Sequence, residues 1–127
     1  MSASLGHANG FILVFSNGWR VYLSVDTGIM SEMKTIIGDI YKPLLAILNP
    51  GGTTLPSEEA AYAANTLLGA TAVIPSHSSE GATEGGKLKD GSRTADLVRV
   101  MEGRKLILSL RGRTMEFDRC AKCVVGC

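Results

Sequence analysis

The chain has 127 residues, which suits one compact domain, and its 45% hydrophobic and 20% charged residues are typical of globular proteins. The formal net charge of +1 gives no general argument for a nucleic-acid or membrane partner. No apolar run approaches the ~20 residues that span a bilayer, and the first residues lack the basic and apolar regions of a signal peptide. A cytoplasmic location is therefore expected.

The first predicted element is a β-hairpin. The continuous apolar run Phe11–Phe15 predicts a strand buried on both faces. Asn17 and Gly18 favour a type I′ turn, because both residues tolerate positive φ angles. Arg20–Val25 is rich in β-branched and aromatic residues and should return as the antiparallel second strand.

Helices and strands alternate after this hairpin. Apolar residues at helical spacing predict a helix over Ile29–Tyr41, and Pro43 ends it. The later predicted elements are a strand at Leu44–Leu48, a helix from Ser57 to a Gly69 cap, a strand at Ala72–Pro75, a polar loop over Ser78–Ser92, a helix at Arg93–Glu102, and strands at Lys105–Leu110 and Thr114–Phe117. The order predicts an α/β fold: a mixed sheet of about five or six strands with two or three helices on one face.

Asp26 lies where the second strand gives way to the first helix. Acidic residues at the C-terminal edge of an α/β sheet are often the ones that carry chemistry. The alternative is that Asp26 only caps the following helix, because Asp is a favoured N-cap residue. Spacing alone leaves both interpretations open.

His77 follows the strand Ala72–Pro75 as Asp26 follows its own strand. If the two strand ends converge, Asp26 and His77 share one substrate or one metal ion, and carboxylate with imidazole suits zinc or manganese. The same pair suits general-base catalysis, in which the acid orients the ring. The plainer alternative is an ordinary histidine at the start of a loop.

Two small groups of residues are candidates for substrate binding. Gly51 and Gly52, which follow Asn49, suit close backbone approach to an anion, but no Lys-Ser or Lys-Thr pair follows as in a phosphate loop. Lys87 and Lys89 form, with Arg93, a small basic cluster around Asp90, for which a solvated loop is the alternative.

The three cysteines lie within the last eight residues. Cys120, Cys123 and Cys127 are an odd set, which does not indicate a disulfide framework, and three thiolates are one short of a structural zinc site. Free cysteines are the favoured interpretation. The expected organisation is one domain over residues 1–117 with a cysteine-containing tail over 118–127.

In their order along the chain, these motifs resemble the C-terminal half of metallo-β-lactamase-fold metal-dependent hydrolases, especially the branch similar to ascorbate-phosphate lactonases. The segments that carry the resemblance are Gly10-Phe-Ile-Leu with the Asn-Gly hairpin, Ser24-Val-Asp-Thr-Gly28, Lys42-Pro43 through Asn49-Pro-Gly-Gly52, Leu55–Ala61, and Ile74-Pro-Ser-His77. The resemblance implies half of an αββα sandwich, with Asp26 and His77 as metal ligands.

The chain also departs from the family pattern. The His-x-His-x-Asp-His signature of the family's N-terminal half is absent. His7 lies near the place of a further family histidine, but it is too close to Phe11 to be an obvious match. Val25 stands where the family has the glycine before its metal-bridging aspartate, and Ser78 stands where it has a tyrosine. One chain therefore cannot assemble the family's two-metal centre.

The absent half leads to an expected assembly. Half of a sandwich leaves one sheet face uncovered, and the apolar patch would exceed what monomers normally expose. We expect a homodimer that packs sheet against sheet, and the alternative is a complex with a separate N-terminal half. The dimer would bring Asp26 and His77 of both copies together, with His7 or a tail cysteine as a further ligand and Ser78–Ser92 closing over the substrate.

The expected function is zinc- or manganese-dependent hydrolysis of phosphoesters, lactones or related esters. In this scheme Asn49, Ser78, Lys87 and Lys89, with the two glycines, contact a small-molecule substrate. One alternative is a non-catalytic assembly module that kept the fold and lost the site. Another is a thiol or zinc role of the cysteine tail alone.

Overall fold

A four-stranded mixed sheet forms the centre of the computed structural model, which describes residues 8–50, 54–77, 83–85, 87–101, 106–110 and 112–127. In the order β1-β2-β3-β4, the strands are Phe11–Val14, Arg20–Leu23, Leu45–Leu48 and Ala72–Pro75. β1 is antiparallel to β2, whereas β2, β3 and β4 are parallel.

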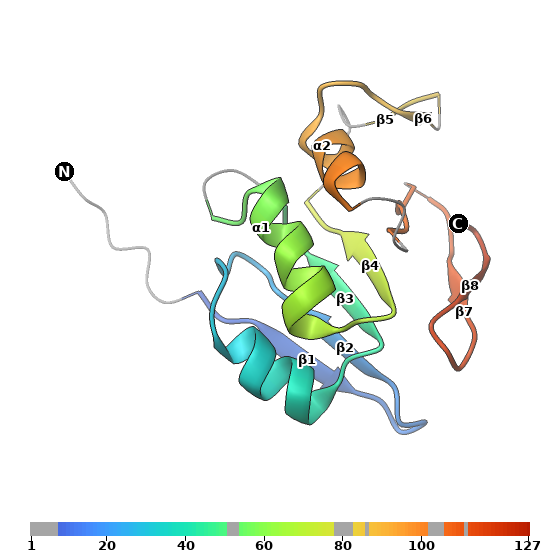
Figure 1. Cartoon of the computed structure of the whole chain (residues 1–127). Helices are drawn as coiled ribbons and strands as arrows, with labels where there is room; N and C mark the ends of the chain where they lie inside the picture. Colours follow the sequence, from blue (N-terminus) through green and yellow to red (C-terminus); the bar gives the residue numbers. More distant parts are fainter. Residues whose placement is uncertain (1–7, 51–53, 78–82, 86, 102–105, 111) are drawn as a thin grey trace.

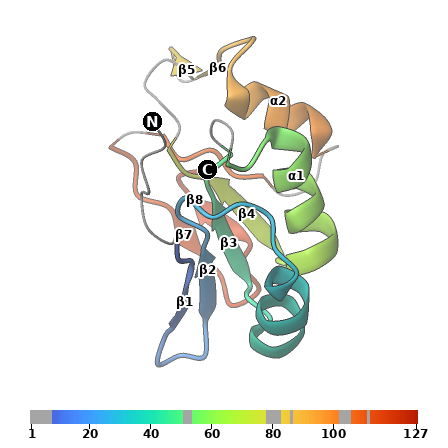
Figure 2. The same ribbon diagram turned by 90° about the vertical axis from the view of Figure 1, so that its left-hand side faces the viewer.

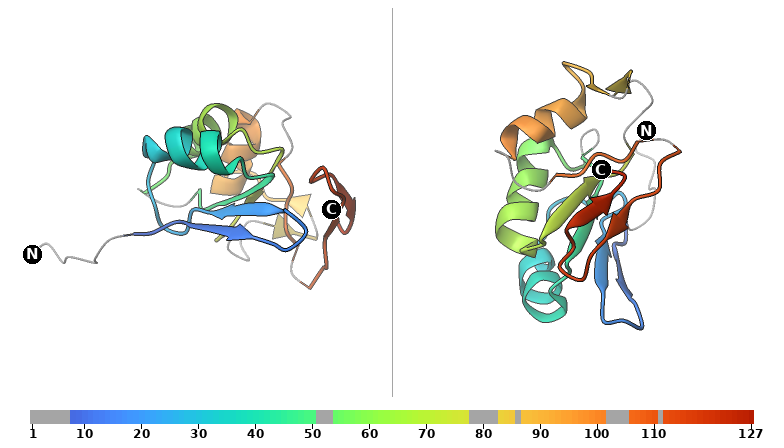
Figure 3. Two further views of the ribbon diagram at one scale, coloured as in Figure 1. Left: turned by 90° about the horizontal axis from the view of Figure 1, so that it is seen from below. Right: turned by 90° about the vertical axis from the view of Figure 1, so that its right-hand side faces the viewer.

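Helices lie on one side of this sheet (Figure 1, Figure 3). They are η1 (Met33–Tyr41), α1 (Ser57–Tyr62) continued directly by η2 (Ala63–Leu68), and α2 (Arg93–Val100). The predicted α/β half-sandwich with helices on one face is confirmed.

The strands alternate between two apolar clusters, as the two-residue period of a strand requires. On β3, Ala46 and Leu48 pack with the helices, whereas Leu45 and Ile47 belong to the cluster on the opposite face. The helical side of the core includes a row of small buried residues on α1 and η2: Ala60, Ala61, Ala63 and Ala64. These small side chains belong to the same apolar cluster as Ala46 and Leu48 of β3.

The opposite face is covered in part by the C-terminal segment. This segment contains β7 (Glu116–Phe117), which is antiparallel to β8 (Cys123–Val125) (Figure 1). The second cluster consists of Val21, Leu45, Ala72, Ile74 and Ala121, with Met115 and Phe117 among the residues packed against it. No regular structure was predicted after position 117. The chain forms β8 there, and Ala121, which lies in the turn before β8, is buried.

β1 differs from the prediction of a strand buried on both faces. Phe11 is 55% exposed and Val14 64%, and Phe15 just beyond the strand is 49% exposed. β1 is the outer strand of the four-stranded sheet, and Ile12 packs against the helix-side cluster. The prediction of burial is therefore wrong for this chain by itself, but the expected uncovered apolar surface is present.

The hairpin turn forms where it was predicted, with another geometry. Gly18 has a φ of 87°, whereas Asn17 is not in the positive-φ region that a type I′ turn needs. The N–H of Phe15 donates to the carbonyl of Trp19 at 2.8 Å, and the N–H of Gly18 donates to that of Phe15 at 2.9 Å. This is the pattern of a type I turn followed by one left-handed residue.

Other predicted elements are shorter than expected or differently placed. The first helix begins at Met33, not at Ile29. In the predicted strand Lys105–Leu110, Leu106 makes one parallel bridge to Val73, so the central sheet has four strands in the described ranges rather than five or six. Part of the predicted polar loop forms a small hairpin, β5 (Thr83–Glu84) with β6 (Lys87–Leu88). None of the described helices is long and apolar enough to cross a bilayer.

Candidate functional site

Polar residues follow all three parallel strands. Ser24 and Asp26 come after β2, Asn49 after β3 and His77 after β4. Because the strands are parallel, their carboxyl ends lie at one edge of the sheet, where α/β proteins bind ligands. β3 lies between the other two, so β2 and β4 are about 10 Å apart at a strand spacing of ~4.8 Å. A cation or substrate that contacts both Asp26 and His77 must therefore lie over the end of β3.

Asn49 joins the end of β3 to the turn that follows β2. Its backbone N–H donates to Ser24 Oγ at 3.0 Å, and its side-chain Nδ2 donates to Asp26 Oδ1 at 2.7 Å. Ser24 is fully buried and Asn49 is only 8% exposed, whereas Asp26 is exposed. The edge thus presents one exposed carboxylate that is hydrogen-bonded to the buried side chain of Asn49.

The turn around Asp26 is strained. Val25 has a φ of 51°, a left-handed conformation that costs an ordinary residue about 1–2 kcal/mol. Thr27 closes the turn, because its Oγ1 donates to the carbonyl of Ser24 at 2.7 Å. Non-glycine residues held in such conformations cluster at functional sites. Asp26 does not cap η1, whose N-cap residue is Glu32, so the capping interpretation is wrong.

His77 occupies a second exposed corner of the same edge. Its φ is 56°, again in the left-handed region. The preceding Ser76 is bound to the end of β3, since its N–H donates to the carbonyl of Leu48 at 2.7 Å and its Oγ donates to the same oxygen at 3.2 Å. The segments that follow β2 and β4, which lie on either side of Asn49 in the sheet, are therefore each hydrogen-bonded to the end of β3.

Tyr22, on β2, is a buried titratable group whose pKa is shifted. Burial raises the pKa of its phenol above the ordinary value, and the side chain of Thr27 lowers it in part. The phenol therefore stays protonated at neutral pH. Tyr22 is not a base for this site.

The described residues do not by themselves complete a metal site. Within them, no group of three or more His, Cys, Asp or Glu side chains is placed to hold one ion. His7, Gly51, Gly52 and Ser78, all predicted site residues, lie outside the described residues. Lys87 and Lys89 are exposed on and beside β6, at the same end of the molecule as the carboxyl ends of β3 and β4 (Figure 1, Figure 2).

The cysteines do not form the predicted free set. Cys123 and Cys127 are joined in a disulfide, and Cys120 is free and exposed. The interpretation of free thiols is therefore wrong for two of the three. A disulfide removes two of the thiolates that a zinc role of the tail would use.

Known proteins with similar sequences are named metal-dependent hydrolases. A UPF0173 metal-dependent hydrolase of Methanosphaera stadtmanae is 44% identical over 73 residues, which are 57% of this chain and 31% of the relative. One from Chloroflexus aurantiacus is 45% identical over 75 residues, 58% of this chain and 30% of the relative. One from Polynucleobacter asymbioticus is 33% identical over 115 residues, 88% of this chain and 38% of the relative. No family model and no solved structure matches.

The resemblance to metal-dependent hydrolases is confirmed. In these matches the chain spans about a third of the length of the UPF0173 relatives.

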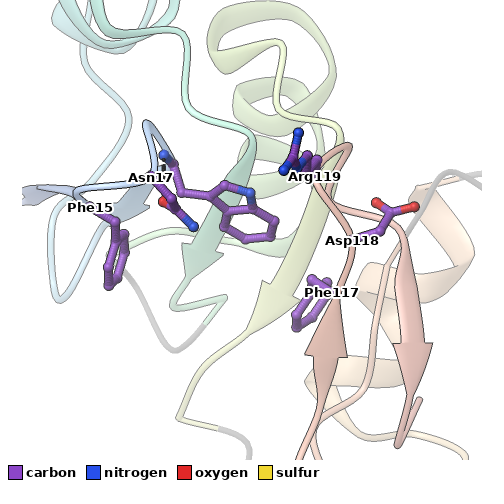
Figure 4. A pocket seen from close by; sticks show the side chains of 6 residues that line it. Phe15, Asn17, Phe117, Asp118 and Arg119 are labelled. Carbon is purple, nitrogen blue, oxygen red and sulfur yellow. Dashed lines mark hydrogen bonds between the residues drawn. The ribbon is translucent and has the colours of Figure 1, made fainter.

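A cleft of about 330 Å³ lies away from the polar edge and was not predicted (Figure 4). It forms where the β1–β2 turn meets the β7–β8 hairpin, and its lining residues are Phe15, Asn17, Trp19, Phe117, Asp118 and Arg119. The ring centroids of Trp19 and Phe117 are 6.0 Å apart. Phe15, which is half-exposed, follows β1 directly and lines this cleft.

Proposed function

We propose that this chain supplies Asp26 and His77 to the centre of a zinc- or manganese-dependent hydrolase that acts on phosphoesters, lactones or related esters. The observation that carries the proposal is the exposed carboxylate of Asp26, which the buried Asn49 holds at the ligand-binding edge of the sheet. The names of the UPF0173 relatives support the metal dependence and the hydrolytic chemistry.

The donor chemistry fits such an ion, although the number of donors falls short. Carboxylate and imidazole suit zinc and manganese, and a catalytic zinc site uses three protein ligands. The remaining ligands therefore come from a second copy or from His7. When bound, the ion lowers the pKa of a coordinated water to ~7 and polarises the ester or phosphoryl oxygen. Lys87 and Lys89 attract the anionic part of the substrate.

The uncovered apolar surface supports a homodimer that completes this site. Phe11 and Leu13 are exposed on the face opposite the helices, since Leu13 is paired with Val21 of the second cluster. Phe15 follows them at the same two-residue spacing and is half-exposed, and apolar residues gathered on one exposed face mark an interaction site. A second copy packed there supplies the missing sheet and a second pair of ligands.

Replacing Leu13 by glutamate is expected to convert the dimer into monomers. Leu13 is 43% exposed in the single chain, so a carboxylate there leaves the fold intact but is buried unpaired in the dimer. Light scattering at micromolar concentration measures the change, and circular dichroism checks the fold. Ile40→Glu is the matched control, because Ile40 is 66% exposed on η1, on the helical side. A folded wild-type monomer contradicts the proposal, and an insoluble wild type rescued by a separate N-terminal half indicates the heteromer.

Asp26→Ala and His77→Ala are each expected to lower hydrolysis by about 100-fold, equivalent to ~3 kcal/mol of lost transition-state stabilisation. The measurement is the rate on a panel of phosphoesters and lactones with added zinc or manganese. Asp39→Ala, which removes an exposed carboxylate of η1, is the control and should leave the rate unchanged.

Two results of this experiment decide against the proposal. Activity that survives both substitutions, or that a chelator leaves untouched, rules out a metal centre at Asp26 and His77. A wild type that dimerises but hydrolyses nothing and binds no metal favours the alternative of a non-catalytic assembly module.

A further inference from the structure

We propose that Asn49 is the positioning residue of Asp26. By donating to Oδ1 of the carboxylate, Asn49 leaves Oδ2 as the oxygen that meets a divalent cation. The inference rests on the proposed function for the identity of the ligand. The hydrogen-bond network that carries it stands on the structure alone.

Asn49 makes hydrogen bonds to the residues before and after the strained Val25. Its backbone N–H donates to Ser24 and its side chain donates to Asp26, so its two hydrogen bonds flank Val25. Because Ser24 is fully buried, the backbone anchor is shielded from water, and a shielded hydrogen bond holds its geometry more firmly. The left-handed conformation of Val25 persists because Ser24 before it and Asp26 after it are both hydrogen-bonded to Asn49.

The side-chain amide of Asn49 has only one workable orientation. An ionised carboxylate accepts hydrogen bonds and donates none, so Nδ2 must face Asp26. The amide oxygen is buried and has no hydrogen-bond partner in the described part of the chain. A buried oxygen without a partner is destabilising, and rotating the amide would bring that oxygen against the carboxylate. The orientation that results is the one in which Asn49 donates to Asp26.

Groups that orient a metal ligand affect the ion almost as strongly as the ligands do. Loss of such an outer-shell partner typically weakens metal binding by about 10–100-fold. We therefore expect Asn49→Leu, which is similar in size and donates no hydrogen bond, to weaken zinc or manganese binding by about 10-fold or more. Asn49→Ser is a milder variant in case the leucine does not fold.

The matched control is Arg20→Met. Arg20 also makes a side-chain hydrogen bond, donating from its guanidinium to the carbonyl of Tyr41 at the end of η1 at 2.9 Å, but it is the first residue of β2, at the opposite end of that strand from Asp26. Isothermal titration with zinc or manganese alone should give wild-type affinity for this variant. Wild-type affinity in both folded Asn49 variants would overturn the inference.

A second readout needs no metal. In the cation-free protein, the side-chain amide proton of Asn49 that is bound to Asp26 should move upfield in nuclear magnetic resonance spectra when Asp26 becomes alanine. If the wild type binds neither zinc nor manganese, the proposed function fails and this shift alone decides the positioning role. An Asn49 amide signal that does not respond to Asp26→Ala overturns the inference.

Discussion

Replacing Gly38 by alanine is expected to lower the free energy of unfolding by about 3 kcal/mol, the upper end of the usual overpacking range. Gly38 lies in η1, and a Cβ atom placed on it would overlap the backbone carbonyl oxygen of Leu67 in η2. A carbonyl oxygen inside a helix cannot rotate away as a flexible side chain can. The two helices would therefore have to separate and give up part of the packing that covers the sheet.

The sign of this effect distinguishes packing from helix propensity. Alanine is about 1 kcal/mol more favourable than glycine within a helix, so propensity alone predicts that Gly38→Ala stabilises the protein. Chemical denaturation of the two proteins measures the difference. Ile40→Ala, in the same helix and at a 66% exposed position, should stay within about 0.5 kcal/mol of the wild type. A Gly38→Ala protein that is as stable as the wild type would show that η1 and η2 do not touch at this glycine.

Local sequence pattern was sufficient for the elements around the helix-side core. The strand at Leu45–Leu48 and the helix from Ser57 to the left-handed Gly69 lie where apolar spacing and capping residues predicted them. The burial of Phe11–Val14 was not predictable in the same way. A continuous apolar run in a sequence indicates a strand, but it does not indicate whether this chain, another chain or solvent covers the faces of that strand.

The sequence named candidate residues but not the connections between them. Asp26 and His77 were singled out because each follows a strand, and Asn49 because it begins the glycine-rich loop. The structure places all three after parallel strands, at one edge of the sheet. Their order across the sheet depends on strand pairing between distant segments, which spacing along the chain does not encode. Ser24 was missed, although a small polar residue between a strand and an acidic turn is a usable signal for a buried hydrogen-bond acceptor.

The C-terminal tail covers part of the face of the sheet that lies opposite the helices. The β7–β8 turn is organised by Asp118, whose Oδ1 accepts from the N–H groups of Cys120 and Lys122 at 2.8 and 2.9 Å. This turn places Ala121, which is fully buried, against Val21 and Leu45. The tail thus covers residues of β2, β3 and β4 on this face, and a second copy has to cover only the side formed by β1.

Replacing Ala121 by aspartate is expected to lower the free energy of unfolding by about 3 kcal/mol, because the carboxylate would be buried among apolar side chains without a partner. The backbone itself favours the change, since Ala121 has a φ of 59° and aspartate tolerates left-handed conformations better than alanine does. Ala121→Gly separates the two effects: it relieves the backbone and removes one methyl group, so we expect a change within about 1 kcal/mol. Urea denaturation monitored by Trp19 fluorescence measures both variants. If Ala121→Asp is as stable as Ala121→Gly, the tail does not pack against the sheet, and the second copy must then cover the whole face.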